Sequence, residues 1–490
     1  MGDIGARHRV RGARLSREPA TLSLGRVAGE QASRIALIDS DQPVSYGELW
    51  AGAQAAQGWL AAQGLLDAPL LASVAEASRR HIELVLAAID LGLPIAFVHP
   101  RLHPAERHEL LSGFPRTAMA PVLDASTLPA GDWPTQGSAP PPQTSRAPRD
   151  DAWRRWEAVL FTSGSTGAPK GVLLGAEQFM AAADASQQNL GWLADDRWLL
   201  SLPVAHVGGL SIVLRCLAAR RTIVLPEPGA GLDLGRLTRA VERQQVSLMS
   251  LVPTQLERLD GWAPPRSLRA ALIGGAAARP ETIARARARG IPTLTTYGAT
   301  EACSQLATQP LGSALREDGA VGPAVAGTRL EIREGRIAAL GPQLMRGYLP
   351  RGNEDGGEAG LQAGWLVTSD AGELTEDGWL RVLGRIDDVI ITGGENVHPT
   401  EVEAALLKCS AVSRALVAGL PDPTFGQIVA ALLVGDAARE ADFTASCRTL
   451  APHKRPRRWR WVERLPELPN GKPDRRKVSE LLGSTPNISA

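Results

Sequence analysis

The feature that most constrains the fold of this chain is an alternation of short apolar runs with helical stretches. The alternation covers residues 21–123 and returns over residues 198–300. Short apolar runs between helical patterns are typical of strands in an α/β layer. The strands expected from these runs are Leu70–Val74, Ile95–Val98, Ala158–Thr162, Trp198–Leu202, Thr222–Leu225, Ser247–Val252 and Ala270–Ile273.

The pattern changes after Tyr348, first to a β-rich stretch through Trp379–Leu383 and then to a compact unit. Pro399 suits the first turn of a helix in this unit, where its missing N–H is not needed. The expected elements of the unit are a strand at Val389–Thr392, a helix at Pro399–Lys408 and a strand at Arg414–Gly419.

The length of 490 residues exceeds that of one ordinary domain. We predict an α/β fold with a large N-terminal unit of several subdomains, residues 21–385, and a small, mobile α+β C-terminal domain, residues 386–490. Residues 1–20 are Arg-rich without an apolar core, so we predict a frayed tail and not a secretory signal. Residues 125–150 are rich in Pro, Ser and Gly and predict a loop or linker.

Composition excludes several functional classes. The net charge of +1 gives no global attraction to nucleic acid. The four cysteines form no CxxC pair, which argues against a zinc site or a disulfide framework and favours a reducing cytoplasm. No apolar run approaches the roughly 20 residues of a membrane span. We therefore expect a cytoplasmic protein that would meet a small anionic ligand at a local site.

A glycine- and hydroxyl-rich segment, TSGSTGAPKG at residues 162–171, follows directly after a predicted buried strand. Glycines let backbone N–H groups approach an anion, hydroxyls donate to its oxygens, and a lysine adds positive charge. The segment does not fit the Walker P-loop pattern. It predicts a phosphate site made by Thr162, Ser163, Gly164, Ser165, Thr166, Gly167 and Lys170.

This segment resembles the signature loop of the adenylate-forming superfamily, which includes acyl- and aryl-CoA ligases, adenylation domains of peptide synthetases and luciferases. Further segments resemble the other motifs of the superfamily in the same order, from about Tyr46 to Val478. They are YGATE at 297–301, GPQLMRGY at 341–348, WLVTSD at 365–370, GRIDD at 384–388, GGENVHPTE at 393–401 and LPNGK at 468–472. Ser369 stands where glycine is usual, a mild departure.

The resemblance implies a nucleotide site for ATP and Mg²⁺. It places Tyr297 on adenine, Thr300 at phosphate, and Glu301 as the magnesium ligand. Asp370 has two acceptor oxygens, which match a ribose diol, and Arg385 can donate to the same sugar. The family resemblance also implies that Gly274 and Gly275 line the nucleotide site.

The resemblance further implies a two-step reaction with coenzyme A as the second substrate. Lys472 would bridge the acid carboxylate and the α-phosphate during adenylate formation. Asp387 would be the hinge about which the small domain turns between the two steps. Gly393 and Gly394 would line the path of coenzyme A.

The segment LPVAHVGGLS, residues 202–211, places His206 where the superfamily has an aromatic or histidine gate to the acid pocket. Amino-acid adenylation domains typically have an aspartate soon after this point, and none occurs between His206 and Leu225. HVGGLS and TEACSQ, at 206–211 and 300–305, are similar to segments of o-succinylbenzoate–CoA ligases of menaquinone biosynthesis. The second carboxylate of such a substrate needs donors, and the candidates are Ser211, Ser304, Gln305 and Thr308.

Alternatives stay open at this stage. The chain could be an aryl- or fatty acid–CoA ligase of another specificity, or a free-standing adenylation enzyme that loads a carrier protein. A catalytically inactive relative acting as a scaffold is a third alternative, against which the retained Lys472, Glu301, Asp370 and Arg385 argue. A homodimer is one assembly that the sequence leaves open. The sequence predicts small-molecule partners and no nucleic acid.

Overall fold

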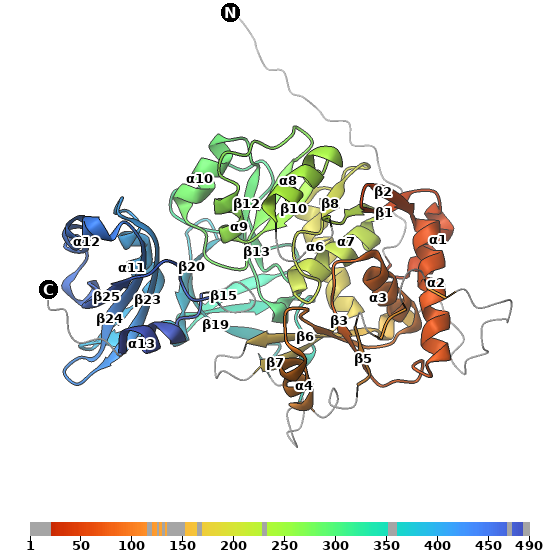
Figure 1. Ribbon diagram of the computed structural model, residues 1–490, viewed down its shortest axis with the longest axis horizontal. Helices are drawn as coiled ribbons and strands as arrows, with labels where there is room; N and C mark the ends of the chain where they lie inside the picture. The colour runs from red at the N-terminus through yellow and green to blue at the C-terminus, as the bar shows by residue number, and fades with distance from the viewer. Residues whose placement is uncertain are drawn as a thin grey trace, which may run out of the picture.

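The structure is a computed structural model, and it describes residues 21–114, 120–124, 127–129, 133–134, 152–163, 169–227, 233–350, 360–467 and 473–483. The predicted tail, most of the predicted linker, residues 164–168 of the phosphate loop and Lys472 lie outside these residues. Figure 1 shows a large unit built from the first four fifths of the chain and a smaller C-terminal unit beside it.

The largest sheet has eight strands in the order β13-β12-β11-β10-β8-β9-β1-β2. Neighbours run parallel from β12 through β1, and only the edge strands β13 and β2 are antiparallel. The strands are β1 (Ile35–Asp39), β2 (Gln42–Ser45), β8 (Arg197–Leu199), β9 (Thr222–Val224), β10 (Leu248–Leu251), β11 (Ala270–Ile273), β12 (Thr293–Tyr297) and β13 (Ala307–Thr308). The helices between these strands are α6 (Ala176–Leu190), α7 (Val207–Ala219), α8 (Leu234–Arg243), α9 (Pro253–Arg258) and α10 (Pro280–Ala288).

The second sheet has six strands in the order β17-β7-β6-β4-β3-β5. Strands β5, β3, β4 and β6 are parallel, while β6 and β7 form an antiparallel hairpin. The strands are β3 (Leu71–Val74), β4 (Ile95–Val98), β5 (Val122–Leu123), β6 (Glu157–Ser163), β7 (Pro169–Gly175) and β17 (Gly347–Tyr348). The helices in the first 112 residues are α1 (Leu24–Gln31), α2 (Tyr46–Ala62), α3 (Arg79–Leu91) and α4 (Pro104–Ser112).

A third, antiparallel sheet completes the large unit. Its order is β14-β20-β19-β16-β15, with β18 paired to β19. The strands are β14 (Gly322–Pro323), β15 (Arg329–Arg333), β16 (Arg336–Leu340), β18 (Leu361–Gln362), β19 (Trp365–Leu374) and β20 (Trp379–Arg385). The β-rich stretch thus begins before Tyr348, earlier than the sequence predicted.

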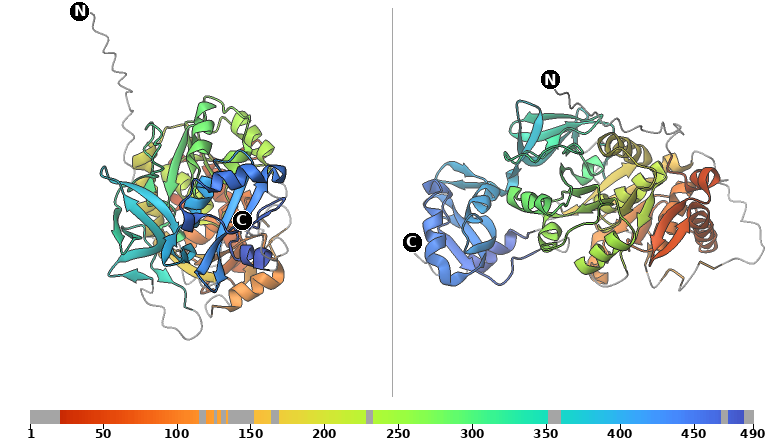
Figure 2. Two further views of the ribbon diagram at one scale, coloured as in Figure 1. Left: turned by 90° about the vertical axis from the view of Figure 1, so that its left-hand side faces the viewer. Right: turned by 90° about the horizontal axis from the view of Figure 1, so that it is seen from above.

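The C-terminal unit has its own sheet and its own hydrophobic core, which is what an independent domain requires. Its core contains Ile390, Val402, Leu406, Val417, Val429 and Phe443. Its elements are β21 (Ile390–Thr392), β22 (Glu395–Val397), α11 (Pro399–Leu406), β23 (Val412–Asp422), β24 (Gly426–Gly435), α12 (Glu440–Cys447), β25 (Arg458–Trp461) and α13 (Arg476–Gly483). The views of Figure 2 show this unit standing against one end of the large one.

The predicted fold class is confirmed, and each apolar run expected to be a strand forms one. The ends differ by up to three residues: the first run begins at Leu71, and the run from Trp198 leaves the sheet after Leu199. Helix α11 ends at Leu406, two residues early, and β23 is longer than predicted. A short 3₁₀ turn, η3 (Ile386–Asp388), connects β20 to the C-terminal unit. Within the described residues, no helix has the length and apolar character that crossing a membrane requires.

Candidate active site

The predicted site residues of the large sheet follow the carboxyl ends of its parallel strands. Gly274 and Gly275 come directly after β11, Tyr297 ends β12, and His206 follows β8. The carboxyl ends of parallel strands meet at one edge of a sheet, and such edges are where α/β proteins bind ligands. The topology therefore gathers at one edge residues that lie up to about ninety positions apart. Gly275 takes a φ of +79°, which suits a residue without a side chain.

A tightly folded loop after β12 positions the next two residues. A Cβ at Gly298 would lie 1.4 Å from the carbonyl oxygen of Ser304, so only glycine fits there. Cys303 and Ser304 have φ values of +50° and +95°, a backbone conformation that non-glycine residues rarely adopt. The surrounding packing holds this strained loop in place, and with it η2 (Thr300–Ala302), which carries Thr300 and Glu301.

Three side chains connect the phosphate hairpin to this loop. Lys170 faces Thr162 across the β6–β7 hairpin, and its Nζ lies 4.9 Å from the ring centre of Tyr348. The Tyr348 hydroxyl donates to Oε1 of Glu301 at 2.9 Å. Burial and the nearby Glu301 carboxylate raise the pKa of Tyr348, so the hydroxyl stays a donor. The arrangement brings Lys170 and Glu301, predicted for phosphate and magnesium, to one place.

A second group of side chains lies at the predicted nucleoside end. The Tyr297 hydroxyl donates to Oδ2 of Asp370 at 2.7 Å. Asp370 and Arg385 pair across strands β19 and β20, with Arg385 Nε 3.6 Å from Asp370 Oδ1. Arg385 Nη2 also donates to Oδ2 of Asp387 at 3.2 Å. Burial and the charge of Asp370 raise the pKa of Tyr297 well above its usual value. Arg385 therefore connects the nucleoside end to the predicted hinge.

The residues at the phosphate end fit a magnesium ion that arrives with its nucleotide. Magnesium is usually held by one or two carboxylates together with substrate phosphates and water. Glu301 supplies one carboxylate, and its Oε1 already accepts from Tyr348. No group of three or more His, Cys, Asp or Glu residues could form a metal cage within the described part of the chain. The site therefore suits Mg²⁺ held jointly with phosphates.

The predicted gate residue His206 lies at the start of α7 and contacts a second histidine that the sequence did not indicate. The rings of His206 and His99 are 5.1 Å apart between centres. His99 follows β4 of the second sheet, so this contact joins the carboxyl edges of two sheets. His99 Nδ1 accepts the backbone N–H of Arg101, which leaves the ring proton on Nε2 in the neutral form. Burial, assisted by Arg101, lowers the pKa of His99 and favours this neutral form.

The most unusual residue near the predicted acid pocket is Arg215, which the sequence analysis did not select. It is 4% exposed on α7, and its Nε and Nη2 have no hydrogen-bond partner among the described residues. Burial lowers the pKa of Arg215 to about 10. Ser211 lies one helical turn earlier on the same face, and its buried Oγ also lacks a partner. The signal that could have found Arg215 is this spacing of four residues from a predicted substrate residue.

The other predicted pocket residues belong to the strained loop and the strand after it. Gln305 is buried; its Nε2 donates to Thr308 Oγ1 at 3.0 Å, while its Oε1 has no partner in the described structure. Thr308 Oγ1 also lies 2.8 Å from the hydroxyl of Thr296. Burial raises the pKa of the Cys303 thiol, and the positive charge of Arg215 on α7 partly opposes this increase. Ser304 is half-buried beside Cys303.

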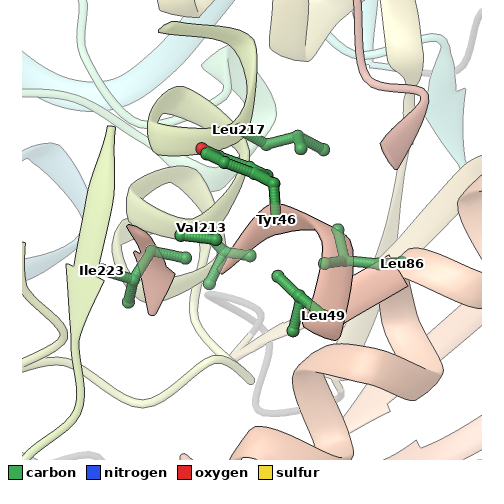
Figure 3. Close-up of a pocket in the computed structure, with 7 residues that line it drawn as sticks. Tyr46, Leu49, Leu86, Val213, Leu217 and Ile223 are labelled. Atoms are coloured by element: carbon green, nitrogen blue, oxygen red, sulfur yellow. The ribbon is translucent and has the colours of Figure 1, made fainter. Parts of the chain in front are cut away.

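An apolar cavity lies on the other face of α7 (Figure 3). Its lining residues are Ala36, Tyr46, Leu49, Leu86, Val213, Leu217 and Ile223. Helical spacing places Val213 and Leu217 roughly opposite Ser211 and Arg215. The Tyr46 hydroxyl donates to the carbonyl oxygens of Cys216 and Arg221. Because the lining offers no cation to a carboxylate, this cavity is a packing gap and not the acid pocket.

The remaining predicted residues lie in or next to the C-terminal unit. Asp387 is the middle residue of η3, and Gly393 and Gly394 form the two-residue turn between β21 and β22. Their φ values of +60° and +86° match a tight hairpin turn that glycine favours. Lys472 and Gly164–Gly167 lie outside the described residues, as does the Ser163 side chain.

Comparison with known families agrees with this geometry. A family model described as AMP-binding enzyme matches residues 24–349, and the AMP-binding enzyme C-terminal domain matches residues 401–472. The chain belongs to the AMP-binding enzyme family. The family's large N-terminal and small C-terminal domains correspond to the two units of the fold.

Similar proteins of this family come from Bacillus. The chain is 32% identical to a 2-succinylbenzoate–CoA ligase of Bacillus pumilus over 464 residues, which covers 91% of this chain and 94% of the relative. An o-succinylbenzoate CoA synthetase from Bacillus subtilis, in complex with the acyl-adenylate intermediate OSB-AMP, superposes with a TM-score of 0.80 at 29% identity. The match covers 96% of this chain and 99% of that one. The same synthetase with ATP and magnesium ion gives a TM-score of 0.79 at 29% identity, covering 93% and 98%.

Proposed function

We propose that this AMP-binding enzyme is an ATP-dependent o-succinylbenzoate–CoA ligase. In the first step, an oxygen of the succinyl carboxylate attacks the α-phosphorus of ATP and pyrophosphate leaves. In the second step, the thiol sulfur of coenzyme A attacks the acyl carbon, loses its proton, and AMP leaves. The products are o-succinylbenzoyl-CoA, AMP and pyrophosphate.

The observation that carries the substrate assignment is the buried guanidinium of Arg215. A buried charge without a partner costs several kcal/mol, so a pocket keeps one where a ligand of opposite charge completes it. Arg215, the Ser211 hydroxyl and the Gln305 amide lie on α7 and the neighbouring loop. The ring carboxylate of o-succinylbenzoate, which does not react, supplies the missing negative charge. The names of the similar Bacillus proteins support the same substrate.

The nucleotide residues fit the first step. The hydroxyl loop around Thr162 and the ammonium of Lys170 would bind the pyrophosphate part of ATP, and Thr300 would donate to phosphate. Mg²⁺, when bound at Glu301, supplies positive charge that neutralises the phosphates. Asp370 and Arg385 would bind the ribose, and Tyr297 would pack on the adenine. Lys472 would bridge carboxylate and α-phosphate while charge develops between them.

The second step requires a route for coenzyme A past the small domain. We place the domain boundary between residues 385 and 386 and the hinge at Asp387, because η3 separates two hydrophobic cores there. Rotation about a short connection of this kind would withdraw Lys472 and bring Gly393 and Gly394 to the pocket. Gate residue His206, in contact with His99, would line the acid pocket near the thiol route.

Arg215 argues against two of the alternatives, and activity measurements distinguish the other two. A pocket for fatty acids or simple aryl acids would leave this charge buried and unpaired, so both are disfavoured. A carrier-loading enzyme would not need free coenzyme A. A scaffold protein would release no pyrophosphate.

The test is a comparison of kcat/KM for four acids with ATP and coenzyme A: o-succinylbenzoate, 4-oxo-4-phenylbutyrate, benzoate and a medium-chain fatty acid. The second acid lacks only the ring carboxylate. We expect it to be about 100-fold or more poorer, because it leaves the pocket donors unpaired. A monocarboxylate that matches o-succinylbenzoate contradicts the substrate assignment and leaves the general acid–CoA ligase activity. Turnover with a carrier protein but not with coenzyme A contradicts the ligase.

We further propose a cytoplasmic location, which is supported by four cysteines that are all buried and free of disulfides. The homodimer stays a prediction, and light scattering of the purified protein tests it.

A further inference from the structure

A half-buried cluster of charged side chains in the C-terminal unit surrounds Arg475, a residue to which the sequence analysis assigned no role. The Arg475 side chain is only 20% exposed. Its Nε donates to Oδ2 of Asp388 at 3.1 Å, and its two terminal nitrogens donate to the two carboxylate oxygens of Glu403. Glu403 Oε1 also accepts the backbone N–H of Val417 at 2.8 Å. Because Arg475 Nη1 also donates to the carbonyl oxygen of Val417, Arg475 binds three separate elements: η3, α11 and β23.

This cluster connects two parts of the chain that the proposed function makes important, the hinge and the lysine segment. Asp388 is the residue after the proposed hinge Asp387, and Arg475 lies three residues after Lys472. Glu467 and Pro473 flank residues 468–472, which include Lys472, and form a β-bridge that we call the base of the lysine segment. Asp474 N–H donates to Pro466 O at 2.9 Å and closes the same base. Arg475 follows this base directly.

We propose that Arg475 is a positioning residue that fixes the base of the lysine segment to Asp388, so that this base and the residue next to the hinge move as one body. A pivot at Asp387 would then move the base of the lysine segment directly, because the hydrogen bond from Arg475 Nε connects the residues at that base to Asp388. The inference rests on the proposed function, which gives Lys472 its role in adenylate formation. It adds a residue that acts on that step through Lys472 without touching a substrate.

Arginine is the residue type that such a connection requires. Its planar guanidinium offers several donors in fixed directions and can bind two carboxylates at once, whereas lysine is a single flexible point charge. Arg475→Lys therefore keeps the charge and most of the packing but loses the simultaneous contact with Asp388 and Glu403. Asp388→Asn removes the charge on the hinge side alone and leaves the Glu403 contact intact.

The experiment measures the two half-reactions separately in the full-length protein. Adenylate formation is followed as pyrophosphate release with acid and ATP, and thioester formation starts from pre-made acyl-adenylate and coenzyme A. We expect Arg475→Lys to lower kcat of adenylate formation about tenfold or more, because a small misplacement of a catalytic group is costly. KM for ATP and acid, and the thioester step, should stay within about twofold, the range of an uncoupled change. Asp388→Asn should show the same selective loss.

Arg414→Lys is the matched control. Arg414 Nη2 pairs with Oε1 of Glu467 at 2.9 Å, so this arginine also contacts the base of the lysine segment but does not reach η3. The control should leave both half-reactions within about twofold of wild type. Equal losses in the control and in Arg475→Lys would overturn the connection to the hinge.

A double mutant separates positioning from general stabilisation. If Arg475 acts through Lys472, adding Arg475→Lys to Lys472→Ala costs nothing further in adenylate formation. Multiplied losses, or a loss of both half-reactions together with a lowered Tm, would show that Arg475 only stabilises the domain and would overturn the proposal. Normal pyrophosphate release by Lys472→Ala alone contradicts the proposed lysine role instead. Failure of wild type on o-succinylbenzoate contradicts only the substrate, since another accepted acid serves for the same measurement.

Discussion

The two ends of the active site differ in how far their polar groups are satisfied without a ligand. At the nucleotide end, Tyr297 donates to Asp370, and Tyr348 donates to Glu301. At the acid end, Ser211 Oγ, Gln305 Oε1 and two nitrogens of Arg215 are buried without partners among the described residues. One end is ordered by its own hydrogen bonds, while the other has buried polar groups that the proposed substrate would complete.

This difference indicates which end of the site sets the selectivity for the substrate. When one hydrogen bond is removed from a group that has another partner or access to water, little free energy is lost, because the other contact replaces the missing one. When a buried group has no partner in the protein, a ligand that fails to contact it loses much binding free energy, since nothing replaces that contact. We therefore expect large, substrate-dependent effects from the acid end and small effects from single contacts at the nucleotide end.

The largest effect is expected from Lys472→Ala, which removes the cation that would act where the two ends meet. Loss of one preorganised contact to developing charge typically costs about 100- to 1000-fold in kcat. Pyrophosphate release should fall by that factor for every acid, while pre-made acyl-adenylate and coenzyme A should still give thioester. Near-normal pyrophosphate release would contradict the role assigned to Lys472.

Arg215→Met should lower kcat/KM for o-succinylbenzoate about 100-fold, because it removes the charged partner of the ring carboxylate. The shape of the side chain is largely kept. The matched measurement uses 4-oxo-4-phenylbutyrate, for which the variant should equal or exceed wild type, because the buried charge is gone. If both acids lose equally, Arg215 serves the fold and the contrast between the two ends is wrong.

Asp387→Pro tests whether one pivot serves both steps. Proline fixes φ near −65° and should hold the small domain near one orientation. One half-reaction should then become about tenfold or more slower than the other, since the catalytic groups of that step are misplaced. The two half-reactions are measured separately, as above, and an unchanged Tm shows that the fold is kept. Equal losses in both steps count against the hinge.

Much of the fold could be predicted because its strands are buried on both faces. Runs such as Ile95–Val98 and Ala270–Ile273 are apolar throughout and bounded by helices, so they are visible in the sequence. The hairpin of β15 and β16 was missed. Strand β15, RLEIR, is half-exposed and its charged residues give no apolar run.

The residues proposed for the nucleotide end were visible in the sequence because each motif is contiguous in the chain, whereas the proposed acid end is made by tertiary contacts. His99 and His206 meet across two sheets although 107 positions separate them. Arg215 follows an apolar helical segment, where an arginine is usually taken as a surface residue. Its burial, and its position 5.9 Å from the centre of the Trp198 ring, become visible only in the folded structure.

The smallest effect is expected from Tyr297→Phe, which removes one hydrogen bond from the end that is already satisfied. Asp370 would keep Arg385 Nε at 3.6 Å and access to water, because its side chain is 22% exposed. A single hydrogen bond of this kind contributes about 1 kcal/mol, so KM for ATP should rise about fivefold while kcat stays near wild type. The ring that would pack on adenine is retained, so binding should not be lost.

The measurement is KM for ATP at saturating acid. Tyr46→Phe is the control variant, since Tyr46 lies beside the cavity behind α7 and not at the nucleotide end. A loss as large as that of Arg215→Met would mean that the nucleotide end depends on its ligand as strongly as the acid end does.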